Sequence, residues 1–81
     1  MDALTREQRA ASLLRDELIV EALETLEQTY TEIWKQSGPE EKEQREQAYN
    51  LVRACEMFRG HLESVVMTGT LTREQQKTLR I

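Results

Sequence analysis

The only proline of the 81-residue chain follows a glycine at Gly38-Pro39, close to the middle of the sequence. Glycine is favoured just past the end of a helix, and proline is favoured in the first turn of the next one. Glu40 and Glu41 follow directly, at the positive end of a helix dipole where carboxylates are favoured. The remainder, rich in Glu, Gln, Leu, Arg and Ala, is typical of helix. The sequence therefore predicts two helical arms joined by one tight turn.

Before this break, apolar residues recur at steps of three and four, which predicts one continuous helix from about residue 6 to about residue 36. Thr5 with Gln8 forms a capping-box start. Asp16 could cap a second segment, but the apolar stripe crosses it, so one helix or a mild kink is favoured. The stripe comprises Ala10, Leu13, Leu14, Leu18, Ala22, Leu23, Leu26, Tyr30, Ile33 and Trp34.

After the break, the apolar positions alternate steps of three and four, the heptad spacing of a packed helical seam. They are Ala48, Leu51, Val52, Cys55, Phe58, Leu62, Val65 and Val66. This pattern predicts a second helix over about residues 39–68, with Gly69 as its stop. Thr72 with Gln75 repeats the capping pattern, so a short third helix is expected over residues 73–79. A glycine inside a helix, Gly60, is most simply explained by close helix approach or a slight kink.

Two helices of this length joined by a tight turn fold back on one another, so the expected fold is an all-α antiparallel hairpin forming a single domain over residues 1–81. This alignment places Ala10 near Val65 and Leu26 near Tyr49. A two-helix core is thin, and the chain offers neither a disulfide nor a metal site, so completion by oligomerisation or by a partner is expected.

Two groups of apolar residues lack an intramolecular cover in this alignment. Opposite Tyr30, Ile33 and Trp34, the segment 40–47 offers no apolar residue. Leu18, Ile19 and Val20 span more of the helix circumference than one partner helix can cover. The predicted protein-interaction residues are Tyr30, Ile33, Trp34, Leu18 and Val20. Exposed aromatic residues beside a polar rim are typical binding hot spots, although Tyr30 and Trp34 could equally plug the turn end of the hairpin.

Charge is unevenly distributed along the chain, whose net charge is −4. Residues 16–46 carry ten acidic and three basic side chains, residues 1–15 have a net charge of +1, and residues 47–81 have a net charge of +2. The hairpin would therefore have an acidic tip and a mildly basic open end, which is either a solvated surface or a means of orienting a partner. The acidic balance argues against nucleic-acid binding.

The composition excludes several classes of protein. Cys55 is the only cysteine, so no intrachain disulfide can form, and one histidine leaves no zinc-ligand cluster. No apolar run approaches the roughly 20 residues of a membrane span, and the N-terminus lacks the features of a signal peptide. The expectation is a soluble protein of a reducing compartment, most simply the cytoplasm, with no membrane association and no cofactor.

Catalytic motifs are also missing from the sequence. It contains no Gly-rich phosphate loop, no zinc-binding His-Glu helix and no EF-hand loop. Cys55 and His61 lie on helix faces about 120° apart, so they do not form a nucleophile and base pair; Cys55 is expected to be a buried small hydrophobe. Glu21, Glu24 and Glu27 read as a solvated face. A chorismate-mutase-like bundle needs several converging cations, and only Arg59 lies near the apolar stripe.

A diffuse pattern over about residues 8–70 resembles small helical-hairpin proteins of tailed phages and prophages, often encoded among head and tail morphogenesis genes. It is carried by Ala22-Leu23-Glu24-Thr25-Leu26-Glu27, Tyr30, Trp34-Lys35, Arg45-Glu46, His61-Leu62-Glu63-Ser64-Val65-Val66 and Gly69. Where those proteins commonly have a Pro-type break, this chain has Arg15-Asp16-Glu17. The resemblance implies a virion or assembly role in the cytoplasm of a bacterial host cell or in the virion, with no enzymatic activity.

The sequence thus favours a non-enzymatic structural or assembly protein that contacts itself or a larger virion protein through its helices. A small acidic inhibitor that binds a host protein is the alternative.

Overall fold

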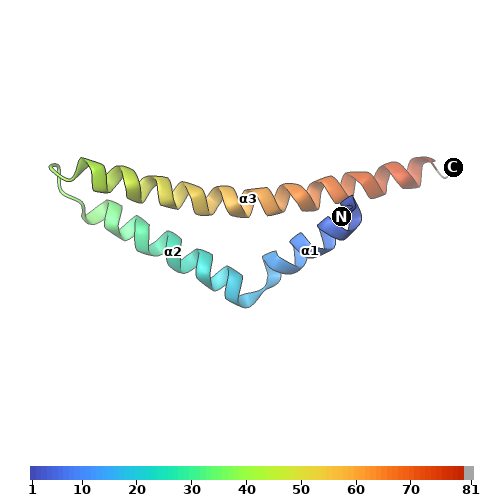
Figure 1. Cartoon of the computed structure of the whole chain (residues 1–81), viewed down its shortest axis with the longest axis horizontal. Helices are drawn as coiled ribbons and strands as arrows, with labels where there is room; N and C mark the ends of the chain where they lie inside the picture. The colour runs from blue at the N-terminus through green and yellow to red at the C-terminus, as the bar shows by residue number, and fades with distance from the viewer. Residues whose placement is uncertain (80–81) are drawn as a thin grey trace.

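The computed structural model describes residues 1–79, whose regular structure is entirely helical and contains no strand. α1 spans Ala3–Arg15, α2 spans Glu17–Gln36 and α3 spans Lys42–Leu79. Figure 1 shows α1 and α2 as the two limbs of a shallow V, with α3 running back across the open side of the V. The molecule is elongated, with extents of 64 × 22 × 18 Å. The predicted all-α class is confirmed, whereas the predicted helix boundaries need three corrections.

The first correction concerns the predicted helix over residues 6–36, which Asp16 divides into two. The Asp16 backbone is extended (φ −67°, ψ 120°), and its Oδ1 accepts hydrogen bonds from the backbone N–H groups of Leu18 at 2.9 Å and Ile19 at 3.1 Å. The side chain therefore satisfies two of the otherwise unpaired donors at the start of α2. This cap outweighs the continuity of the apolar stripe and produces the point of the V (Figure 1).

The second correction concerns the start of the chain. Asp2, and not Thr5, is the N-cap of α1, because its Oδ1 accepts a hydrogen bond from the Thr5 backbone N–H at 2.7 Å. Aspartate and threonine are both good caps, and the capping box at Thr5 would have sacrificed the first turn of the helix. This hydrogen bond lowers the pKa of the Asp2 carboxyl.

The third correction concerns the second arm, which is one helix and not a helix over 39–68 followed by a short helix over 73–79. Gly69 does not end α3, and Thr72 does not cap a new helix, because its hydroxyl donates to the Thr68 carbonyl one turn earlier at 2.9 Å. Thr68 and Thr70 make the same type of bond to the preceding turn. Threonine hydroxyls can bond within a helix as well as cap one, and here they do the former.

The reversal between the arms occupies residues 37–41. The Glu41 N–H donates to the Gly38 carbonyl at 3.0 Å, which closes a tight turn around Pro39. The Arg45 guanidinium reaches back from the first turns of α3 and donates to the same carbonyl at 2.5 Å. Proline therefore sits inside the turn, and α3 begins at Lys42, later than expected.

Small residues make the closest contacts between the arms. Ala10 and Ala48 are the only buried hydrophobic residues in the described part of the chain, at 3% and 1% exposure. Gly69 is also buried, and a Cβ built on it would overlap the Cβ of Glu7 in α1. Gly60, where a close approach or a slight kink is expected, has open space where its Cβ would be. The close approach between the helices therefore lies at Gly69 and not at Gly60.

Candidate interaction surface

Six residues at helical spacing mark the inward sides of the three helices, and we call them the seam. Each is buried or half-buried, and the spacings of seven residues in α2 and α3 are those of a heptad. The seam comprises Ala10 in α1, Leu23 and Tyr30 in α2, and Ala48, Cys55 and Leu62 in α3. Cys55 is half-buried and not fully buried as expected.

A second apolar set follows the seam three residues later on every helix, and we call it the apolar face. A step of three residues turns a helix by about 300°, which equals about 60° backwards. Because α3 runs antiparallel to α1 and α2, this rotation points to the same side of the molecule on all three helices. The apolar face comprises Leu13 in α1, Leu26 and Ile33 in α2, and Leu51, Phe58 and Val65 in α3.

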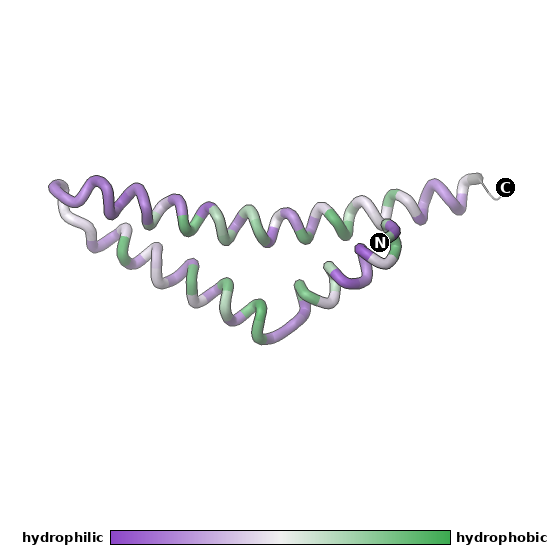
Figure 2. Tube along the Cα trace, in the orientation of Figure 1, coloured by the Kyte–Doolittle hydropathy of each residue, from purple (hydrophilic) through white to green (hydrophobic). Residues whose placement is uncertain are grey.

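The apolar face is open to solvent. Leu13, Leu26, Leu51 and Phe58 are 42%, 44%, 42% and 52% exposed, whereas Ile33 and Val65 are half-buried. Figure 2 shows apolar residues recurring along α2 and along the middle of α3, whose first turns are hydrophilic. A monomeric protein rarely leaves a continuous row of large apolar side chains uncovered while its seam buries alanines.

The side of the seam opposite the apolar face is mostly covered. Four residues after each seam position stand Leu14, Glu27, Trp34, Val52, Arg59 and Val66, and of these only Trp34 is exposed. Glu27 and Arg59 form an ion pair across the arms at 2.8 Å, with side chains 25% and 33% exposed. The Oε1 atom of Glu27 is shielded from water, so its charge is compensated by the guanidinium alone. This side is therefore closed by its own residues.

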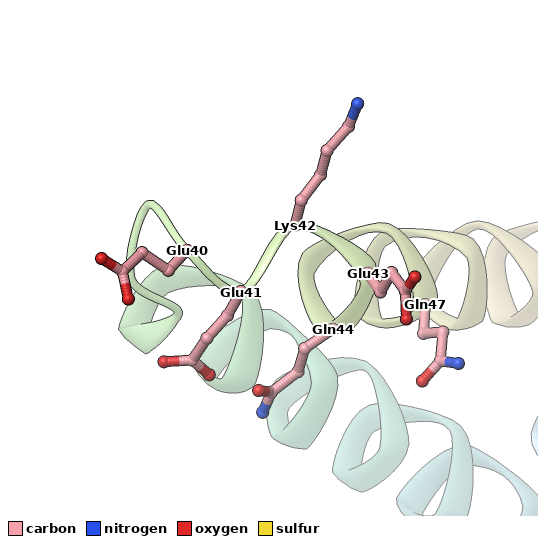
Figure 3. A pocket seen from close by; sticks show the side chains of 6 residues that line it. All are labelled: Glu40, Glu41, Lys42, Glu43, Gln44 and Gln47. Atoms are coloured by element: carbon pink, nitrogen blue, oxygen red, sulfur yellow. The ribbon is translucent and has the colours of Figure 1, made fainter.

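The two ends of the molecule carry opposite charges. At the turn, three carboxylates and one ammonium group line a shallow hollow, together with Gln44 and Gln47. Figure 3 shows Lys42 pointing away from the other five side chains, while the carboxylates of Glu40, Glu41 and Glu43 spread outward without converging on a common point. Diverging carboxylates give this end a negative potential but no metal or catalytic site.

At the open end, Arg6 and Arg9 of α1 line a hollow with Leu13, His61 and Val65, beside Met1, Ala10 and Leu62. This hollow confirms the expected proximity of Ala10 and Val65. It also shows that Leu13 and Val65 lie on the same side of the molecule. Nearby, Glu7 is engaged by Arg73 of α3 at 2.6 Å. Arg6 and Arg9 therefore remain as cations beside the apolar face.

The five residues predicted as an interaction site do not share one surface. Ile33 belongs to the apolar face, and Tyr30 belongs to the seam. Leu18 is 70% exposed beside the point of the V, where it follows the Asp16 cap. Trp34 is 47% exposed and lies on the other side of the seam, as does half-buried Val20. Any partner that covered all five would have to surround α2.

No group of three or more His, Cys, Asp or Glu side chains within residues 1–79 could hold a metal ion. His61 is exposed beside Arg6, whereas Cys55 lies in the seam, so the structure does not bring these two reactive side chains together. Arg59, the cation expected near the stripe, is engaged by Glu27.

The sequence does indicate apolar residues without a cover, because its apolar stripes cover more of the helix circumference than one partner helix can bury. That width shows that some apolar residues have no cover inside the chain, but it does not show which ones, because both the seam and the face consist of apolar residues at helical spacing. Which residues of a stripe face inward depends on how each helix is rotated about its own axis, and only the structure gives this rotation.

None of the helices within residues 1–79 combines the length and apolar character needed to cross a membrane. Comparison with known proteins finds no matching protein-family model, no similar curated protein and no similar solved structure.

Proposed function

We propose that this chain is a non-enzymatic structural or assembly protein of the phage type, which acts by helix-to-helix contacts through its apolar face. One observation carries the proposal: Leu13, Leu26, Leu51 and Phe58 of the apolar face are exposed, while the only fully buried hydrophobic residues of the described chain are the two alanines of the seam. Side chains of this size provide binding free energy only when another surface covers them. The resemblance of residues 8–70 to small phage hairpin proteins supports the assembly role.

The decisive experiment compares two double variants by light scattering across a hundredfold dilution, with helicity measured in parallel. L26K/F58K places two charges in the apolar face. M57K/M67K adds the same two charges on exposed outward positions, which are 67% and 60% exposed. We expect the unchanged chain and M57K/M67K to form the same assembly and L26K/F58K to lose it.

A contrary result is equally clear. If the unchanged chain and both variants remain fully helical monomers at every concentration, and if the two variants have the same melting temperature, the apolar face is not an interface between copies of this chain. Assembly by self-association would then be wrong, and the proposed function would be restricted to docking on a larger protein.

A second candidate, an acidic inhibitor of a host protein, is favoured by the carboxylates that spread from the turn (Figure 3). It predicts that E40Q/E41Q/E43Q abolishes capture of one host protein in a 1:1 complex while L26K/F58K leaves it intact. The assembly role predicts the reverse dependence.

A further inference from the structure

We infer that the occupant of the apolar face is a second copy of this chain, paired antiparallel about a two-fold axis at Phe58. The inference rests on the proposed function and adds the identity and orientation of the partner. It is carried by the symmetry of the face, by the charges at its two ends and by its size.

Symmetry is the first support. Leu51 and Val65 stand seven residues before and seven residues after Phe58 on the same side of α3. Rotation by 180° about an axis through Phe58 therefore places Leu51 of one copy near Val65 of the other, in both directions at once. A two-fold interface requires this self-complementarity, because each residue must meet its counterpart reciprocally. Heptad stripes two residues wide are also the pattern that packs four-helix bundles.

Charge is the second support. Arg6 and Arg9 lie beside Leu13 and Val65 of the face at the open end, and Glu40 and Glu43 line the hollow at the turn. In the antiparallel pair the turn of one copy lies over the open end of the other, so carboxylates meet guanidinium groups at both ends. In a parallel pair acidic side chains would face acidic ones and basic side chains would face basic ones, which is unfavourable.

The axial positions agree with this pairing. Glu43 stands 15 residues before Phe58, or about 22 Å along the helix. Arg6 shares a hollow with Thr68, ten residues after Phe58, or about 15 Å along the helix. The remaining offset is within the combined reach of an arginine and a glutamate side chain.

Size is the third support. The molecule is 64 Å long and 22 Å wide, so one of its broad sides can supply the ~800 Å² per partner that a standard stable interface buries. Phe58, 52% exposed at the centre of the face, would stack against its own symmetry mate. Central aromatic residues of this kind dominate the affinity of interfaces.

Charge reversal tests the orientation. In the antiparallel pair, R6E/R9E and E40R/E43R each turn attraction into repulsion at both ends, so we expect each double variant to self-associate about tenfold or more weakly. The quadruple variant R6E/R9E/E40R/E43R exchanges the signs of both ends and should recover the original affinity. If both double variants associate as tightly as the unchanged chain, the antiparallel pairing is wrong. The same conclusion follows if the quadruple variant does not recover.

A distance measurement gives an independent answer that does not depend on affinity. A spin label at E40C in a C55A background, whose mass and helicity are checked first, would report the separation of the two turns. We expect about 50 Å, because residue 40 stands about 27 Å from the axis in each copy. A separation of about 20 Å or less would mean parallel copies and would overturn the inference while leaving the proposed function intact. A folded monomer at every concentration would overturn it as well.

Discussion

The seam and the apolar face both consist of apolar residues at helical spacing, yet they differ in burial. The most deeply buried side chains are small, and the large ones of the face are exposed. The seam buries two alanines almost completely, whereas the face leaves leucines and a phenylalanine about half exposed. In a self-sufficient domain the largest apolar side chains occupy the interior. The difference indicates that the seam sets the distance between the arms, while the large side chains of the apolar face have no cover inside the chain.

The largest effect is expected when a charge enters the seam. Leu23→Asp removes a half-buried leucine and leaves an unpaired carboxylate between the arms, which costs about 3 kcal/mol or more. A thin core cannot absorb this loss, so we expect the helical circular dichroism signal to collapse at every protein concentration. Thr25→Asp, exposed two residues away, is the matched control and should melt near the unchanged chain. A Leu23→Asp chain with unchanged helicity and melting temperature would show that the seam contributes little.

The two helical glycines offer a comparison within α3. Gly69→Ala places a Cβ against the Cβ of Glu7, and we expect a net loss of about 1–2 kcal/mol of stability, because the overlap outweighs the better helix propensity of alanine. Gly60→Ala meets nothing within 4 Å and should gain about 0.5–1 kcal/mol. Thermal melts of the two variants should therefore move in opposite directions, and a shift in the same direction would contradict the close approach at Gly69.

Two adjacent residues of α2, Ile33 and Trp34, lie on opposite sides of the seam. Ile33→Ala removes a side chain of the apolar face, and we expect about a tenfold loss of self-association, equivalent to about 1.4 kcal/mol. Trp34→Ala changes the exposed aromatic residue on the other side and should lower self-association less. Sedimentation equilibrium measures both. An equal loss from Trp34→Ala would mean that the interface continues around α2, as the sequence prediction of Trp34 as an anchor requires.

The Asp16 cap fixes the point of the V. It thereby sets how the apolar face of α1 is oriented relative to that of α2. Asp16→Ala removes hydrogen bonds to two backbone N–H groups and should cost about 1 kcal/mol. Asp16→Asn keeps an oxygen acceptor and should lose much less. Hydrogen exchange of the Leu18 and Ile19 amides should increase in the alanine variant only. Unchanged exchange there would mean that packing, and not the cap, divides α1 from α2.

Much of the helical fold could be predicted from the sequence, because it depends on helix propensity and on the spacing of apolar residues, which are local properties. The reversal at Gly38-Pro39 and the helical periodicity of both arms lie within reach of propensity and spacing. The helix boundaries depended on competition between local signals. Asp2 and Thr5 both had capping chemistry, and Thr72 could either cap or bond backwards, so the choice rested on the energy of the whole arm and not on one motif.

The candidate site was harder to predict, since it depends on how the arms rotate about their own axes. The five predicted residues all came from one arm, which the alignment showed to lack a cover. Leu13, Leu51 and Phe58 were assigned to the packed stripes, and the structure leaves them exposed. Half of the apolar face thus lies on α3, where the regular heptad had suggested complete burial.

The smallest expected effect concerns the first turn of α1, at the basic end of the molecule. The backbone hydrogen bond from Thr5 lowers the pKa of the Asp2 carboxyl, so the folded state favours the ionised form. The stabilisation is present above the ordinary pKa of aspartate and is lost as the pH falls through the lowered value in the folded chain. We expect amide exchange in the first turn of α1 to increase below about pH 4, after correction for intrinsic rates. Asp2→Ser retains a cap that does not titrate, so its first turn should show no such change. An acid transition of equal size in the serine variant would show that the effect does not come from the Asp2 carboxyl.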